Sequence, residues 1–122
     1  MAALRIAFEA PDSPGNSAAI GRKPIDFAHL SVQTMGDKAL EIEVLQLFAR
    51  QARQIMKDIV EGEGTARAQA AHRLKGAALA VGAVDVAKTA GAIEHDPSDM
   101  SLPGDLSAAV LEAELFILKL CR

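Results

Sequence analysis

Apolar residues recur at every third or fourth position along most of this chain, which predicts helices rather than strands. The longest such pattern begins after Gly36, with Asp37 as its N-cap, and runs to about Val60. Its apolar positions are Leu40, Val44, Phe48, Ala52, Ile55 and Ile59. This spacing places them on one side of a helix, as expected for an element packed along a core.

Further helical patterns lie on both sides of this one. A short helix is predicted over residues 25–34, between Pro24 and the stop at Gly36. After the turn "EGEGT" (61–65), a helix capped by Thr65 runs to Val81 and breaks at Gly82, and another covers residues 84–94. The loop "HDPSDMSLPGD" (95–105) precedes a last helix capped by Asp105. Its predicted buried face comprises Leu106, Val110, Ala113, Phe116, Ile117 and Leu120.

Four substantial helices with short connections predict an all-α fold, an antiparallel up-and-down four-helix bundle. The short additional N-terminal helix would lie across one end. Residues 1–23 are rich in Pro, Gly and Ser and are interpreted as a flexible N-terminal tail, which leaves residues 24–122 as one helical bundle domain.

Composition agrees with this interpretation and excludes several kinds of partner. Half of the 122 residues are hydrophobic, but only 3% are aromatic, which favours helices built from alanine and leucine. The net charge is −3 without a cluster of Lys or Arg, so no nucleic-acid partner is expected. No stretch approaches the about 20 apolar residues of a membrane span, and we expect a cytoplasmic protein without a membrane partner.

The segment "AHRLKGAALAVGA" (70–82) interrupts an alanine-rich helix with polar residues and a glycine. At about 100° per residue, Ala70, Leu74, Ala77 and Val81 share the core side, and His72 points to the opposite side. A solvated surface histidine remains possible on position alone. The neighbours favour a site, because they comprise a cation (Lys75), a gap (Gly76) and an exposed apolar side chain (Leu79). An imidazole with a pKa of about 6.5 is partly neutral at pH 7, so its free nitrogen can attack phosphorus.

The run "HRLKGAALAVGA" resembles the signature of histidine phosphotransfer (HPt) domains, and the similarity extends from about Pro24 to the end of the chain. The resemblance implies a four-helix bundle in which His72 carries a phosphoryl group. It also implies that His72 accepts this group from a receiver-domain phosphoaspartate and passes it to another receiver in a two-component phosphorelay. Lys75 and Gly76 match the positions that flank the histidine in the family. Ala77 stands where many members have serine.

A carboxylate near His72 follows from the geometry of the predicted turn. If the chain reverses at Gly82, His72 and Glu94 stand at similar heights on neighbouring helices, since each residue adds about 1.5 Å. Glu94 would then accept a hydrogen bond from one ring nitrogen and leave the other free for attack, a place where the family often has Gln or Glu. The alternative is a solvated glutamate at the end of its helix.

The resemblance implies response-regulator receiver domains as partners, together with a hybrid histidine kinase. We expect them to dock on Leu79, Ala68 and Met35, and we expect a monomer. No cofactor is expected on this chain, and Mg²⁺ is expected on the receiver. The sequence has no GxxxxGK[ST] motif, so the chain is interpreted as a phosphocarrier without kinase activity of its own.

Three other functions fit the sequence less well than phosphotransfer. A metal site is disfavoured because His29, His72, His95 and Cys121 lack ligand spacing. The main alternative is an HPt-like binding module that docks a response regulator without carrying phosphate. The dimerisation domain of a histidine kinase is a weaker alternative, because it would need a two-helix dimer.

Overall fold

The computed structural model describes residues 24–121, which form five helices and no strand. The helices are α2 (Phe27–Thr34), α3 (Lys38–Glu61), α4 (Gly64–Val81), α5 (Val84–His95) and α6 (Leu102–Leu120). The prediction of an all-helical bundle is therefore confirmed. The predicted N-terminal tail, residues 1–23, lies outside the described residues.

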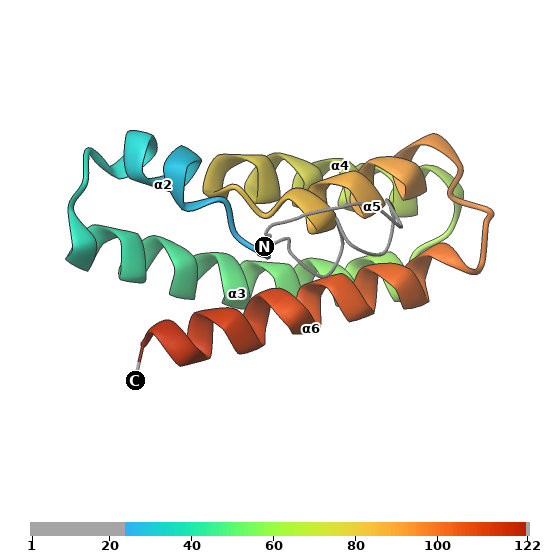
Figure 1. The fold of residues 1–122 in the computed structure, drawn as a ribbon. Helices are drawn as coiled ribbons and strands as arrows, with labels where there is room; N and C mark the ends of the chain where they lie inside the picture. Colours follow the sequence, from blue (N-terminus) through green and yellow to red (C-terminus); the bar gives the residue numbers. More distant parts are fainter. Residues whose placement is uncertain (1–23, 122) are drawn as a thin grey trace, which may run out of the picture.

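The four long helices close a ring around a common core. Helix α3 packs against α4 and α6, and α5 packs against the same two helices. Figure 1 shows α3 and α6 side by side on one side of the bundle, with α4 and α5 on the other. The short α2 contacts α3 and α4 at one end of the molecule.

Small side chains dominate the half of the core that α4 and α5 contribute. The buried residues of these two helices include Ala70, Ala71, Ala78, Ala87 and Ala90. The spacing between packed helices depends on the side chains at the contact, so alanines let the two backbones approach closely. The larger core side chains come mainly from the other elements. They include Leu30, Leu45, Phe48, Ile59, Leu106 and Ile117.

Gly82 ends α4 and also contacts the residue that precedes α2. Its φ of 79° is in the left-handed region, which favours glycine at the end of a helix. The Asp26 N–H donates to the Gly82 carbonyl at 2.8 Å, so the start of α2 lies directly on this turn. A Cβ added at Gly82 would stand 2.8 Å from the Asp26 carbonyl oxygen. The predicted break at Gly82 is confirmed, and the packing against Asp26 adds a second reason for glycine there.

Two of the predicted helix caps are wrong. Helix α4 begins at Gly64 with Glu63 as N-cap, so Thr65 lies inside the first turn. Helix α6 begins at Leu102 with a proline in its first positions, which places Asp105 in the first turn as well. Proline is favoured there because the first N–H groups of a helix have no partner inside it. The cap at Asp37 is confirmed, since its carboxylate accepts from the Leu40 N–H at 3.1 Å.

Most residues of the predicted apolar stripes are buried, and the two exposed exceptions lie at the ends of their helices. Leu40 and Leu120 lie in terminal turns and are exposed, while Leu45, which the spacing did not select, is buried. A terminal turn extends past the neighbouring helices, so an apolar residue there has fewer atoms to pack against. Ala77 and Phe116, both predicted for the core, are only partly buried against it.

A buried arginine joins three parts of the chain. Arg67 donates from Nε to the Ile59 carbonyl at 2.9 Å and from Nη1 to the Pro97 carbonyl at 3.0 Å. The guanidinium therefore ties the end of α3 and the loop before α6 to the start of α4. Burying a charged group is costly unless its donors are satisfied, and backbone carbonyls satisfy them here.

Candidate functional site

His72 lies on the outer side of α4, as the helical rotation predicts. Its side chain is 66% exposed, whereas Leu74, two residues further on, is completely buried. The alternation follows from the helical repeat, because two residues advance the direction of the side chain by about 200°. The imidazole is therefore accessible while its own helix is held firmly in the core.

Glu94 of α5 lies beside this imidazole. The distance between His72 Nδ1 and Glu94 Oε2 is 2.8 Å. The close contact arises because the chain reverses at Gly82, which brings the two residues to similar heights on adjacent helices. A carboxylate accepts hydrogen bonds, so it favours the tautomer with the proton on Nδ1. In that tautomer Nε2 keeps its lone pair.

Lys75 reaches the same carboxylate from α4. Its Nζ lies 2.7 Å from Glu94 Oε1, so each oxygen of Glu94 has one partner. The lysine side chain passes Gly91 of α5, where an added Cβ would stand 3.4 Å from Lys75 Cδ. The ammonium was predicted from the sequence as a counter-charge for an arriving anion, and in the structure it also pairs with Glu94.

The ion pair and the hydrogen bond keep Glu94 ionised. The hydrogen bond from Lys75 is the largest cause that lowers the pKa of Glu94, and His72 lowers it further, while partial desolvation opposes both. An ionised Glu94 accepts from both neighbours at once. The carboxylate thus fixes the ammonium and the ring on one side of the site.

Gly76 leaves open space one turn after His72. A Cβ added at this glycine would have no atom within 4 Å beyond its own helix backbone and adjacent residues. Close packing against a neighbouring helix therefore does not explain the glycine at this position. The glycine costs the helix about 1 kcal/mol relative to alanine, and no contact in the structure accounts for it.

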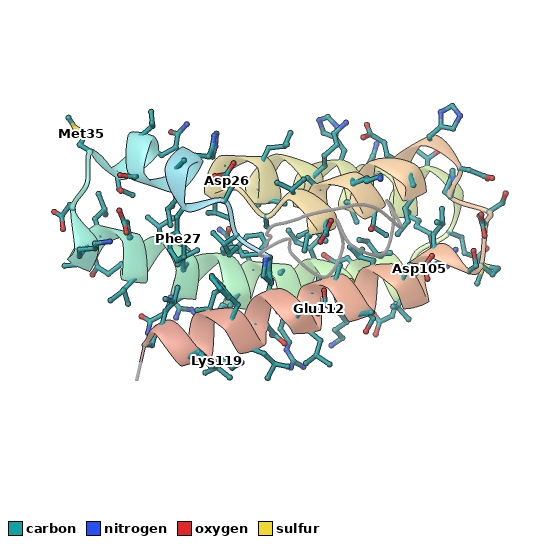
Figure 2. The ribbon with its side chains drawn as sticks, viewed as in Figure 1. Asp26, Phe27, Met35, Asp105, Glu112 and Lys119 are labelled. Carbon is teal, nitrogen blue, oxygen red and sulfur yellow. The ribbon has the colours of Figure 1, made fainter. Side chains whose placement is uncertain are left out.

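The three residues predicted for docking do not form one patch with His72. Ala68 lines a shallow hollow of about 830 Å³ that also includes His72 and Glu94. Leu79 is 55% exposed and lines a second hollow of about 350 Å³ with Lys75. Met35 lines neither of these hollows and stands at the outer end of the molecule, after α2 (Figure 2).

The second hollow is also lined by Asp26, the N-cap of α2, and by His29 of α2, neither of which was predicted for docking. They line it together with Leu79, and Nε2 of His29 is inaccessible and has no hydrogen-bond partner among residues 24–121. His29 is half-buried, and His95, which the sequence analysis places in the loop 95–105, is instead the last residue of α5. No local signal reveals the position of His29, since it depends on how α2 docks at Gly82.

Comparison with known families settles the relationship of this chain. The family model for the Hpt domain matches residues 43–116, which is more than half of the sequence. The chain belongs to the HPt domain family. The match runs from α3 into α6 and includes His72, Lys75, Gly76 and Glu94. Searches of curated proteins and of solved structures gave no significant match.

Two searches of the described part of this HPt domain gave negative results. No helix between residues 24 and 121 is long and apolar enough to cross a membrane. The same residues contain no group of three or more His, Cys, Asp or Glu that could hold a metal ion.

HPt domains carry phosphoryl groups in two-component phosphorelays and are not kinases.

Proposed function

We propose that His72 accepts a phosphoryl group from the phosphoaspartate of one receiver domain and passes it to the aspartate of another. The observation that carries this proposal is the 2.8 Å contact between His72 Nδ1 and Glu94, made by a ring that is otherwise open to solvent. With the proton held on Nδ1, the lone pair of Nε2 faces outward, which is what attack on phosphorus requires.

The transfer itself exchanges one bond to phosphorus for another. Nε2 forms the new nitrogen–phosphorus bond while the bond from phosphorus to the aspartyl oxygen breaks, and that oxygen leaves with its electron pair as a carboxylate. The phosphorylated ring keeps its proton on Nδ1 and gains positive charge, which ionised Glu94 stabilises. Mg²⁺ on the receiver would offset charge on the phosphoryl oxygens, and Lys75 would add a cation from this side.

Lys75 has a second role in this proposal. In the free protein its ammonium stands 2.7 Å from Glu94 Oε1, close to the ring. A phosphoryl group on Nε2 brings further negative charge to the same face, so the flexible lysine can share its three donors between the carboxylate and the phosphoryl oxygens. We therefore assign Lys75 to charge stabilisation and Glu94 to positioning of the ring.

We also infer the finer architecture and the domain limits. The ring of contacts among α3, α4, α5 and α6, joined by short connections, supports an antiparallel up-and-down four-helix bundle with α2 across one end. Residues 24–122 constitute the HPt domain in this proposal. Its partners are receiver domains and a hybrid histidine kinase that supplies the phosphoryl group.

A transfer assay tests the assignment of His72. A receiver domain carrying a radioactive phosphoryl group is mixed with the wild-type chain, with His72→Gln, and with His29→Gln and His95→Gln as matched controls. We expect the label on the wild type and both controls, stable in base and labile in acid, and none on His72→Gln. Far-UV circular dichroism should show the same helix content for all four proteins.

The outcome also separates the proposal from the binding-module alternative. Label that persists on His72→Gln would refute the assignment. A wild-type chain that binds the phosphorylated receiver in a pull-down but acquires no label would show that it docks without carrying phosphate. The contact between His72 and Glu94 favours phosphotransfer, since a module that only docks has no need of an oriented ring nitrogen.

A further inference from the structure

The side of the bundle formed by α3 and α6 carries a groove that the proposed function does not use. Two hollows of about 500 Å³ each lie along it and share Arg53, Leu111 and Glu114. Arg53 crosses the groove and binds Glu114 through two hydrogen bonds of 2.6 and 3.0 Å. The groove lies across the bundle from the helices that hold His72 and Glu94 (Figure 1).

Helix α6 presents a row of leucines along this groove. Leu111, Leu115 and Leu118 are 50%, 50% and 62% exposed, although the opposite side of the same helix is buried in the core. Their spacing of four and then three residues is that of the apolar seam along which two helices pair. Three large side chains in a row on one helix make a continuous apolar surface rather than scattered exposed residues.

Charged residues flank the leucines in a pattern that a second copy would complement. Glu112 and Lys119 each follow a leucine of the row by one position, and they form no ion pair within residues 24–121. Figure 2 shows both along α6, separated in the direction of the helix. One copy thus carries a negative and a positive charge on the same edge of its apolar seam.

In place of the monomer expected from the sequence, we propose that the chain forms a symmetric homodimer in which α6 pairs with α6 of a second copy in the antiparallel direction. Leu115 of one copy packs against Leu118 of the other, and the two-fold axis passes between these positions. Each α6 then fills part of the groove between α3 and α6 on its partner. In a two-fold symmetric interface the same surface of each copy contacts the other, and every contact occurs twice. The surface must therefore be complementary to itself, as the edge of this helix is.

The charges select this register. With Leu115 against Leu118, Glu112 of each copy lies beside Lys119 of the other, which gives two equivalent ion pairs at the edge of the seam. Moving the antiparallel pairing by one heptad, so that Leu111 faces Leu115, would instead place Glu112 beside Glu112. Like charges at that position would be unfavourable, so one register is preferred over the other.

The dimer leaves both phosphoacceptor sites accessible. His72 lies on α4 and its partner Glu94 on α5, and the proposed contact involves α3 and α6. Each copy could therefore meet a receiver while the two remain associated. The dimer stands independently of the proposed phosphotransfer, because neither His72 nor Glu94 takes part in it.

Sedimentation of the full-length chain tests the proposal. Over about 1 µM to 1 mM, the wild type should pass from monomer to dimer. The double variant Leu115→Gln, Leu118→Gln should remain monomeric, with unchanged helix content and unchanged transfer to His72. Leu47→Gln is the matched control, because Leu47 is 47% exposed on α3 and lines neither hollow. It should dimerise like the wild type.

Charge reversal tests the register. Glu112→Lys or Lys119→Glu alone converts both ion pairs into like-charge pairs and should raise the dimer dissociation constant by roughly tenfold. The double reversal restores opposite charges and should recover the wild-type constant. A wild type that stays monomeric throughout, a double leucine variant that still dimerises, or charge variants that all behave alike would each overturn the proposal. The first result would also be the one expected if residues 1–23 or another protein covers the groove.

Discussion

Replacing Gly76 should move stability and phosphotransfer in opposite directions. A Cβ at this position meets no atom within 4 Å, so Gly76→Ala removes backbone freedom from the unfolded chain without creating a clash. The expected gain is up to about 1 kcal/mol, the difference between glycine and alanine inside a helix. For a domain of about 100 residues this corresponds to a rise in Tm of roughly 4–8 °C.

The same methyl group should slow phosphotransfer. It projects into the open space one turn from His72, where the receiver has to bring its phosphoryl group close to Nε2. Reacting atoms must approach to about 3–3.5 Å, and a misplacement of about 1 Å costs roughly a hundredfold in rate. Gly76→Ala should therefore reduce the transfer rate measurably, and Gly76→Leu should reduce it by about a hundredfold or more.

Gly82, the C-cap of the same helix, offers the contrasting case. Its φ of 79° and the 2.8 Å approach of a Cβ to the Asp26 carbonyl oxygen make any side chain unfavourable there. Gly82→Ala should destabilise the fold by about 1–3 kcal/mol, while transfer per folded molecule stays close to wild type. Thermal melts and transfer rates of Gly76→Ala, Gly76→Leu, Gly82→Ala and the wild type test whether stability and transfer change in opposite directions at Gly76. A stabilised Gly76→Leu that transfers at the wild-type rate would refute the reasoning.

Three further substitutions test the surroundings of His72. Leu79→Glu should slow transfer strongly and change the Tm little, because the side chain is 55% exposed; a large loss of stability with normal transfer would contradict its docking role. Leu74→Ala should do the reverse and cost about 2–5 kcal/mol in denaturant unfolding, since Leu74 is fully buried. The pKa of Glu94 lies below its ordinary value of 4.5, chiefly through its hydrogen bond with Lys75. Its ionised form therefore stabilises the fold above pH 4.5, and this contribution is lost as the pH falls through the lowered pKa. Glu94→Gln should unfold with a weaker dependence on pH below 4.5 than the wild type, and an identical dependence would show that the ion pair does not stabilise the fold.

The order of the helices and the exposure of His72 could be predicted from the sequence because both depend on local periodicity. The helical repeat alone puts His72 opposite Leu74. The reversal at Gly82 follows from one glycine at the end of an apolar pattern. Even the proximity of Glu94 could be estimated, since His72 and Glu94 are separated from the turn at Gly82 by similar numbers of residues and therefore stand at similar heights on the two helices.

Other features depend on contacts between segments that are distant in the sequence, so no local pattern predicts them. Thr65 and Asp105 are suitable capping residues, but packing starts both helices earlier, and a weak local preference gives way to it. Arg67 is buried because two carbonyls from other segments meet its donors. Helix α2 reaches the Leu79 hollow only because it docks on Gly82.

Helix α6 shows the division between sequence and tertiary structure most clearly. The predicted face is buried at Leu106, Val110, Ala113 and Ile117, but the same helix carries a second apolar row, Leu111, Leu115 and Leu118, that the sequence analysis did not single out. The sequence determined that α6 is a helix with more apolar surface than one core needs. Only the packing of α6 between α3 and α5 showed that the second row stays exposed and lines a groove beside α3, because the position of a neighbouring helix is not contained in local periodicity.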